Sequence, residues 1–347
     1  MSNLDNTINQ IIEDNDIPNE WNNLITKELE ELDPENNINR KNLTDTPFIT
    51  IDGEDAKDFD DAIHCNQNNS SFTLKVAIAD VASVVSPNSE IDKQAFKRGT
   101  SIYFPKKVIP MLPEIISNDL CSLVPNKERN VIICEIVFDL SGGIESYEFY
   151  EALIISFKRF TYNEIQDYRN DGSKISNSLE SLKKLTDKLL QKKFKRNALE
   201  IESTEPILDI DNGGNILDIN IPKRLFAHQM IEESMIAANI CAAKFIKKHY
   251  GFGIYRVHEE PESIKIEALK KFFSLKGRLS KSHENTLELI NSFIEYANKN
   301  EDNKLLNILI LQSLKRAQYS SKEIGHFGLQ LQQLSLIHIS EPTRPDE

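Results

Sequence analysis

The residues best suited to chemistry are six carboxylates that fall within ten positions, between two apolar segments with strand-like composition. They are Asp52, Glu54, Asp55, Asp58, Asp60 and Asp61. Two carboxylates about 5 Å apart repel each other by roughly 3 kcal/mol at an effective dielectric near 20, so several together oppose folding unless a cation lies among them. Ligands that are all oxygen suit Mg²⁺ or Mn²⁺ and argue against zinc. The sequence therefore predicts a divalent-cation site in this acidic loop (residues 52–61).

The spacing within the acidic loop restricts its backbone. In an extended strand Asp58 and Asp60 share one face and Asp61 points to the other. Asp60 and Asp61 can both reach one metal only if the backbone bends there, and Gly53 lets the chain turn back after Asp52. Such a cluster could hold one metal ion, or two about 3.5–4 Å apart, which is the arrangement that stabilises the attacking and leaving oxygens in phosphodiester cleavage.

Three other interpretations of the acidic loop are weaker. A solvated surface loop is disfavoured by the apolar segments on both sides. A calcium loop of the EF-hand type needs Gly at its sixth position and Glu at its twelfth, and the register that starts at Asp52 has neither. A phosphatase with an aspartate nucleophile requires a long apolar strand before residues 58–60, and that strand is absent from the sequence. Metal-assisted phosphodiester chemistry is the interpretation that remains.

Composition sets broad limits on the protein. The 347 residues are 39% hydrophobic, which is enough for one large domain or two ordinary ones. We expect no membrane segment and no secretory signal, because no run of 18 apolar residues occurs and the first residues lack a basic-then-apolar layout. Four scattered cysteines form no CxxC pair, which indicates reduced, buried thiols in a cytoplasmic protein.

Charge leaves nucleic-acid binding open. The net charge of −13 does not favour binding to phosphates, which needs Lys and Arg. Basic side chains nevertheless cluster in three stretches, at residues 93–107, 183–196 and 265–281. Each of them is more often a solvated helix face than a binding groove. Composition alone therefore does not decide whether RNA is a partner.

The elements that must position the acidic loop change in type along the chain. Residues 1–46 form a polar lead-in with helical periodicity. Segments with strand composition follow, and we expect strands at residues 48–52, 60–65, 72–80, 130–139 and 146–156. Three- and four-residue apolar spacing then predicts helices at residues 178–195, 225–249, 262–275 and, more loosely, 284–318. Strands first and helices later predict an α+β fold.

These residues resemble the ribonuclease II/R family. The matching motifs occur in family order over roughly residues 41–333: TIDGEDAKDFDDAI (50–63), VAIADV (76–81), RGTSIYFP (98–105), IPMLPE (109–114), LCSLVPN (120–126), IEESMIAANICAA (231–243), GFGIYRVHEEP (251–261) and GHFGL (325–329). The resemblance implies an RNB-type catalytic domain of α+β class, with mixed and antiparallel sheets in the first half and packed helices in the second. It also implies a hydrolytic 3′→5′ exoribonuclease that degrades single-stranded RNA to nucleoside 5′-monophosphates.

The resemblance also assigns site residues. Asp52, Asp58, Asp60 and Asp61 match the family's catalytic aspartates, which implies that they are also the ligands of Mg²⁺ or Mn²⁺; the two other carboxylates of the loop are not assigned. The residues implied to contact RNA are Tyr103, Tyr162 and Glu232. Aromatic faces stack on any base, at roughly 1–3 kcal/mol each. A carboxylate on a helix could accept a hydrogen bond from a ribose 2′-hydroxyl. Single-stranded RNA is the expected partner, and no obligate protein partner is evident.

The sequence also departs from the family pattern. We expect a lead-in or linker at residues 1–46, a catalytic domain at 47–334 that is incomplete at its carboxyl end, and a non-native tail at 335–347, because LSLIHISEPTRPDE matches nothing in the family. We expect the flanking RNA-binding barrels and the family's arginine motif at the scissile phosphate to be missing from this chain, and Ile201 replaces an aromatic that is common in the family. The activity of this chain is therefore expected to be impaired. A non-catalytic RNA-binding remnant and an assembly artefact remain alternatives, as does the choice between ribonuclease II-like and ribonuclease R-like handling of duplexes.

Overall fold

The computed structural model describes residues 3–32, 39–201, 207–211, 213–220, 224–275, 285–299 and 303–336. Its described residues divide into two compact units. The first unit contains residues up to Lys184 together with those from 207 to 232, and the second contains residues 185–201 and those from 233 onward. Helices α5 (Lys174–Lys195) and α6 (Phe226–Tyr250) belong partly to each unit.

The lead-in segment contains two helices, α1 (Asn3–Asp14) and α2 (Asn23–Glu30). Asn22 caps α2, because its side chain accepts hydrogen bonds from the backbone of the first turn. Helix α1 buries Ile8 and Ile12 against Ile109. This contact attaches the start of the chain to the hairpin of β5 (Ile102–Phe104) and β6 (Lys107–Ile109).

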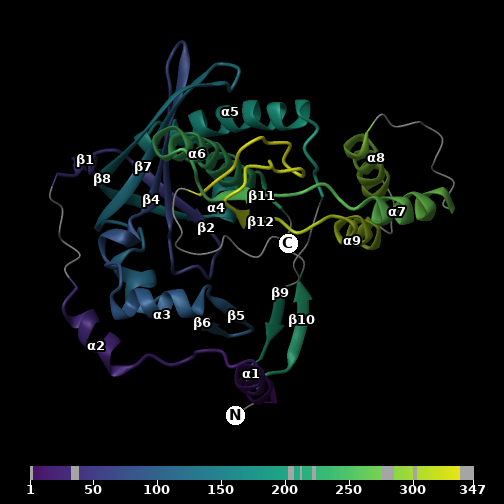
Figure 1. The fold of residues 1–347 in the computed structure, drawn as a ribbon. Coiled ribbons are helices and arrows are strands. Elements are labelled where there is room, and N and C mark those ends of the chain that lie inside the picture. Colours follow the sequence, from purple (N-terminus) through teal and green to yellow (C-terminus); the bar gives the residue numbers. More distant parts are fainter. Residues whose placement is uncertain are drawn as a thin grey trace. The chain divides into compact units, whose positions relative to one another are not determined.

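The first unit is built around a closed ring of five strands (Figure 1). In chain order these are β2 (Phe48–Asp52), β3 (Asp61–Gln67), β4 (Ser71–Ala79), β7 (Glu128–Asp139) and β8 (Ile144–Thr161). Strands β2 to β4 and β7 pair in sequence, all antiparallel. Strand β8 is 18 residues long and closes the ring, because its first part pairs with β7 and its last part runs parallel to β2. The short strand β1 (Lys41–Asn42) adds to β8.

The remaining elements of the first unit lie between and after these strands. They are the single-turn helix η1 (Val81–Ser83), α3 (Glu90–Arg98), the hairpin β5 (Ile102–Phe104) and β6 (Lys107–Ile109), the π-turn η2 (Ile116–Leu120), α4 (Tyr162–Asp167), and the hairpin β9 (Ile207–Ile210) and β10 (Ile216–Asn220). The strands predicted from the sequence are all present, and the α+β class is confirmed.

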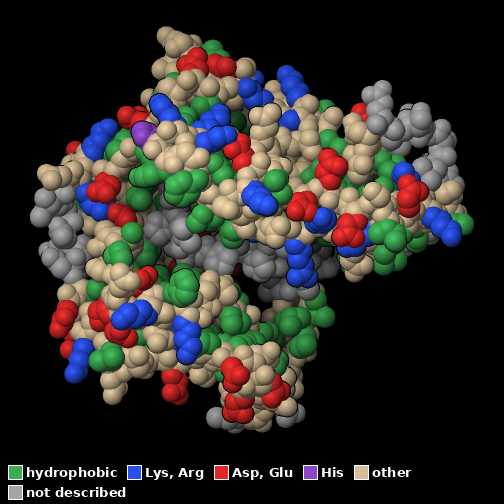
Figure 2. Space-filling model, viewed as in Figure 1, with side chains coloured by type: hydrophobic (Ala, Val, Ile, Leu, Met, Phe, Trp, Pro, Cys, Tyr) green, Lys and Arg blue, Asp and Glu red, His purple; other side chains and the backbone are tan. Residues whose placement is uncertain are grey.

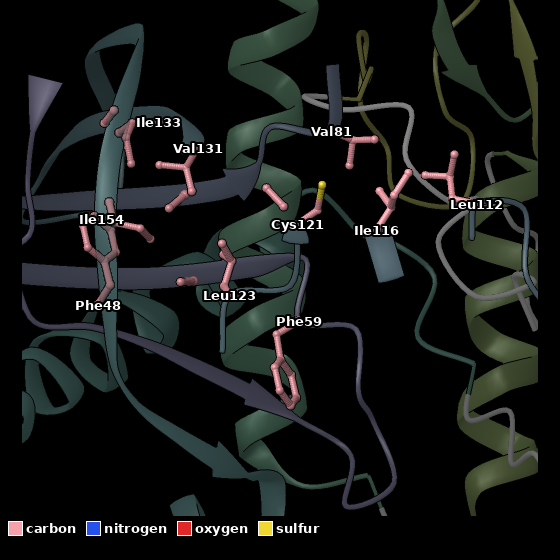
Figure 3. Close-up of a cluster of buried hydrophobic side chains, with 14 of the residues drawn as sticks. Phe48, Phe59, Val81, Leu112, Ile116, Cys121, Leu123, Val131, Ile133 and Ile154 are labelled. Carbon is pink, nitrogen blue, oxygen red and sulfur yellow. The ribbon is translucent and has the colours of Figure 1, made fainter. Parts of the chain in front are cut away.

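One apolar core fixes the inner face of the strands (Figure 3). Alternate residues of β7 and β8, such as Ile133 and Ile154, are fully buried there because side chains of a strand point to its two faces in turn. Phe59, which belongs to the acidic loop, is also part of this core and is 7% exposed. The acidic loop is thus anchored by its own aromatic side chain.

The second unit is mainly helical. Helices α7 (Ser263–Leu275), α8 (Thr286–Asn298) and α9 (Asn303–Ser313) share a core in which the rings of Phe273 and Phe293 stack 4.0 Å apart. A small antiparallel pair joins β11 (Tyr255–Val257) to β12 (Gln318–Ser320). The single loose helix predicted for residues 284–318 is wrong. Helix α8 ends at Asn298 and α9 begins at Asn303, which are the first and last residues of the polar run at 298–303.

Two further expectations bear on the chain's environment. Among the helices in the described part of the chain, none is long and apolar enough to cross a lipid bilayer. All four cysteines are free and buried, which agrees with the expected reduced thiols. Burial raises the pKa of the Cys65 and Cys121 thiols to about 12, so both stay protonated and unreactive at neutral pH.

One buried and one half-buried histidine, His258 and His326, lie side by side in the second unit. The rings of His258 and His326 lie 5.1 Å apart, and the Nδ1 atom of each accepts a hydrogen bond from a backbone N–H, of Gly328 and Leu329 respectively. Burial lowers the pKa of His326 to about 4, with the charges of His258 and Arg256 acting in the same direction. Burial also lowers the pKa of His258. These contacts give both histidines a structural role.

Acid should therefore destabilise the second unit through His326. Its pKa lies below the ordinary value of 6.5, so the unfolded chain binds more protons between pH 6.5 and pH 4. The contribution of His326 to the free energy of unfolding is fully present above pH 6.5. It falls by about 3 kcal/mol as the pH drops to 4. Urea unfolding of the wild type and of His326→Gln across this range measures the effect. A His326→Gln slope equal to that of the wild type would contradict the assignment.

Candidate active site

The acidic loop connects the ends of two paired strands. Strand β2 ends at Asp52 and β3 begins at Asp61, and the pairing of Ile49 with Ile63 brings these ends together. The N–H of Ala79 donates to the Asp60 carbonyl at 2.9 Å, so Asp60 still lies alongside β4. The predicted turn at Gly53 is present, since the Ala56 N–H donates to its carbonyl at 3.3 Å. Regular strand geometry resumes at Asp61, and the bend expected between Asp60 and Asp61 stays a prediction.

Three of the four predicted aspartates act on one another. Burial, together with the charges of Asp52 and Asp60, raises the pKa of the Asp61 carboxyl to about 8. A carboxyl with this pKa is largely protonated at neutral pH unless positive charge is brought to it. Asp58 lies half-buried in the same loop. The sequence thus predicted the repulsion correctly, although the structure ties it to Asp61 in particular.

The donor set suits a hard divalent cation. All the candidate ligands are carboxylate oxygens, and the charge that a cation brings would restore the ionised form of Asp61. Within the described residues, no three acidic, histidine or cysteine side chains already surround one point closely enough to hold a metal ion. The chemistry of the residues therefore fits Mg²⁺ or Mn²⁺, and the predicted ligand set stays a prediction.

Two residues far away in sequence hold the acidic loop. The Ser122 hydroxyl accepts a hydrogen bond from the Phe59 N–H and donates one to the Lys57 carbonyl, both at 3.0 Å. Arg159 Nη2 donates to the carbonyls of Gly53 and Glu54 at 2.6 and 2.8 Å. Neither Ser122 nor Arg159 was predicted from the sequence to support the loop. The only signal for Ser122 was its place in the LCSLVPN motif, and Arg159 had none.

Tyr162 lies beside the acidic loop. It begins α4 directly after Thr161, which pairs with Asp52 in the ring of strands. Its ring stacks on His228, with centroids 3.8 Å apart and planes 16° apart. His228 is one turn before Glu232 on α6, and Glu232 forms an ion pair with Arg224. The predicted Tyr162 therefore contacts α6 one turn away from the predicted Glu232, within the first unit.

The two adjacent glutamates of α6 have different surroundings. The Glu232 side chain is 34% exposed, whereas that of Glu233 is 3% exposed and pairs with Lys193 at 3.3 Å. Only Glu232 is therefore accessible to a ligand. The family resemblance assigns RNA contact to Glu232, and the exposed side chain of Glu232 is compatible with that prediction.

Tyr103 lies on a different element from the other predicted RNA contacts. It is in the β5–β6 hairpin with 59% of its surface exposed. The turn of this hairpin contains Lys106, which donates a hydrogen bond to the Asp211 carbonyl. Lys107, the first residue of β6, donates to the Asn9 side chain at 3.2 Å. An exposed aromatic beside two lysines has the composition of a base-stacking surface.

On the face that Figure 2 shows, basic and acidic side chains are interspersed over the described residues and form no continuous positive surface. Arg98 of the first stretch has a structural role, because it lies over the Trp21 ring at 3.6 Å and donates to the carbonyls of Pro110 and Glu20. Ile201 packs against the helical core of the second unit.

The closed strand ring, the acidic loop and the helical second unit define a known class of domain. The family model described as "RNB domain" matches residues 40–344, and the chain belongs to this family. Ribonuclease R of Vibrio parahaemolyticus is 36% identical over 345 residues, which cover 94% of this chain and 41% of that protein. Ribonuclease R of Escherichia coli (strain K12) is 36% identical over 346 residues, 95% of this chain and 42% of that protein. The chain thus spans less than half the length of these two relatives.

Solved structures of RNase R match the fold of this chain. The structure of Mycoplasma genitalium RNase R in complex with ribose methylated single-stranded RNA matches with a TM-score of 0.89 and 32% identity, over 95% of this chain and 53% of that one. The same enzyme in complex with double-stranded RNA matches with a TM-score of 0.89 and 33% identity, over 97% and 62%. Of the predicted tail at 335–347, only Ser335 and Leu336 are described, and Ser335 is buried with its hydroxyl on the Ile254 carbonyl. Residues 337–347 lie outside the described part of the chain.

Proposed function

We propose that this chain is a metal-dependent hydrolytic 3′→5′ exoribonuclease that acts on single-stranded RNA and releases nucleoside 5′-monophosphates. The observation that carries the proposal is the acidic loop itself, which joins the paired ends of β2 and β3 on a strand ring of the RNB family. Family membership supports RNA as the substrate, since the M. genitalium relative binds both single- and double-stranded RNA. A cytoplasmic location is part of the same proposal and is supported by the four free, buried cysteines.

In this proposal Asp52, Asp58, Asp60 and Asp61 hold Mg²⁺ or Mn²⁺. When bound, such an ion lowers the pKa of its water and balances the charge that develops on phosphodiester oxygens. The protein's own part is to present carboxylates from a fixed loop and to place the last nucleotide against them. Tyr162, which follows the β8 residue paired with Asp52, provides an aromatic ring at that place. Tyr103 provides a second, exposed ring for stacking.

The test is degradation of a 5′-labelled single-stranded oligoribonucleotide by the purified chain with Mg²⁺, with Mn²⁺ and with EDTA. Stepwise shortening from the 3′ end with a metal, and none with EDTA, is the expected result. Identification of nucleoside 5′-monophosphates by mass spectrometry tests the product. A ladder that is independent of metal would contradict the proposed chemistry.

The second candidate function is RNA binding without cleavage. The observation that favours it is that no three potential ligands among the described side chains already enclose a cation position. The same experiment separates the two functions when RNA binding is followed by fluorescence anisotropy. Binding that leaves the RNA intact at every metal concentration supports the second candidate.

Glu232 should distinguish RNA from DNA. A carboxylate at this position accepts a hydrogen bond from a ribose 2′-hydroxyl, which DNA lacks. We expect Glu232→Gln to weaken the affinity for an oligoribonucleotide by about 10-fold, as for loss of one charge-assisted hydrogen bond, and to leave the affinity for the matched DNA unchanged. The Glu232 side chain also pairs with Arg224, so Arg224→Gln serves as the control for loss of that ion pair. An equal loss of affinity for RNA and DNA would exclude 2′-hydroxyl recognition.

A further inference from the structure

We propose that Ser122 and Arg159 are positioning residues that hold the acidic loop from two sides, and that Ser122 fixes the direction of Asp58. The inference rests on the proposed function, because it assigns these residues a purpose in cation binding. Both side chains are proposed to act on the backbone of the loop and not on the charge of its carboxylates. Ser122 acts through its hydroxyl, and Arg159 acts on backbone carbonyls.

Ser122 fixes the backbone on both sides of Asp58. Its side chain is fully buried, and its hydroxyl bonds the Lys57 carbonyl and the Phe59 N–H, each at 3.0 Å. The next residue, Leu123, donates its N–H to the Phe59 carbonyl at 2.8 Å. Three hydrogen bonds thus hold the residues before and after Asp58. With both neighbours held, the backbone torsions of Asp58 and the direction of its side chain are restricted.

Phe59 adds an apolar anchor to these hydrogen bonds. Its ring is 7% exposed and packs in the same buried cluster as Leu123 (Figure 3). Side chains alternate in direction along an extended segment, so a buried Phe59 turns Asp58 and Asp60 away from the core. The serine and the phenylalanine together present these two carboxylates on the side opposite to the apolar interior.

Arg159 holds the beginning of the loop. Its Nη2 atom donates to the carbonyls of Gly53 and Glu54 at 2.6 and 2.8 Å, and its guanidinium lies 5.4 Å from the centre of the Phe59 ring. Arg159 belongs to β8, where it pairs with Thr50 of β2. The side chain therefore connects the strand ring to both the start and the middle of the acidic loop.

A loop with several close carboxylates needs such support. Mutual repulsion favours conformations in which the carboxylates of Asp52, Asp60 and Asp61 separate. Pairing the carboxylates with lysines would hold the loop but would also occupy the oxygens that a cation needs. Ser122 and Arg159 hold the backbone and leave the carboxylate oxygens available. The loop is then organised before the metal arrives, which lowers the cost of binding it.

The test compares Ser122→Ala with Ser178→Ala in the 347-residue chain. Ser178 is a matched control in the same unit, because it is 4% exposed and its hydroxyl accepts a hydrogen bond from a strand N–H, that of Cys65, at 2.9 Å. Mn²⁺ binding is measured by electron paramagnetic resonance without RNA, and RNA shortening is measured separately. Ser122→Ala is expected to raise the Mn²⁺ dissociation constant by about 10-fold and to lower kcat by about 10²-fold with little change in KM, as for a misplaced catalytic group. Ser178→Ala should change neither quantity.

Arg159→Lys provides a second variant that does not depend on the fold surviving loss of Ser122. Lysine keeps the charge but lacks the planar fork that reaches two carbonyls, so a weaker loss of Mn²⁺ affinity in the same direction is expected. Wild-type Mn²⁺ affinity and kcat in both folded variants would overturn the positioning roles and leave the exoribonuclease proposal intact. A wild-type chain that binds no Mn²⁺ would overturn both, because no cation site would then exist to be positioned.

Discussion

Replacement of Asp60 with asparagine is expected to lower the rate of RNA shortening by about 10²–10³-fold, the range for removal of one electrostatic group from a preorganised site. Asparagine has nearly the same shape as aspartate but no charge, so it weakens a hard-cation site without creating a cavity. The assay is the metal-dependent shortening of a 5′-labelled oligoribonucleotide under single-turnover conditions. RNA affinity in EDTA should be unchanged.

The folding of this variant provides an independent check. Asp60 is one of the two charges that raise the pKa of Asp61, so its removal relieves repulsion in the absence of metal. Asp60→Asn should therefore unfold at a temperature equal to or above that of the wild type in EDTA. Asp55→Asn is the matched control, since Asp55 is exposed in the same loop and is not assigned to the metal. If both variants retain wild-type rates, the acidic loop is not the catalytic site.

Replacement of Glu233 with alanine is expected to lower the free energy of unfolding by about 3–5 kcal/mol, the usual cost of breaking a buried ion pair from one side. The side chains of Glu233 and Lys193 are 3% and 8% exposed, so the variant leaves a buried ammonium without its counter-charge. Urea unfolding followed by circular dichroism measures the change.

The exposed pair of Glu180 and Lys184 is the natural comparison. Its side chains are 49% and 53% exposed, and Glu180→Ala should leave the free energy of unfolding nearly unchanged because water and salt screen such pairs. The double variant Lys193→Met with Glu233→Leu should recover much of the stability lost in Glu233→Ala, because no charge is then left buried. A loss below 1 kcal/mol in Glu233→Ala would show that water reaches this pair.

The elements were predictable wherever local pattern determines them. Apolar alternation located β2, β4 and β7, and three- and four-residue spacing located α5 to α7. The break between α8 and α9 was missed, because the polar run at residues 298–303 was included in a loosely periodic segment. The closure of the ring by β8 could not be predicted, because which strand pairs with which depends on contacts between distant segments.

The site residues were likewise predictable only where a local sequence pattern marks them. Carboxylate spacing identified the acidic loop, since repulsion acts between neighbours in sequence. Ser122 and Arg159 contact that loop from 63 to 106 positions away, and a single serine or arginine has no local signature for such a role. The different surroundings of Glu232 and Glu233 depend on which way each faces on α6, which the partners Arg224 and Lys193 reveal only in three dimensions.

The double pairing of β8 has a consequence for synthesis of the chain on the ribosome. Strands β2 to β4 and β7 emerge first and can pair in order, but the two outer members keep open edges until Thr161 has been made. Open edges of this kind invite pairing with other nascent chains. The strand ring that carries the aspartates is therefore completed only after β8 has been made, because this one strand pairs with both open edges.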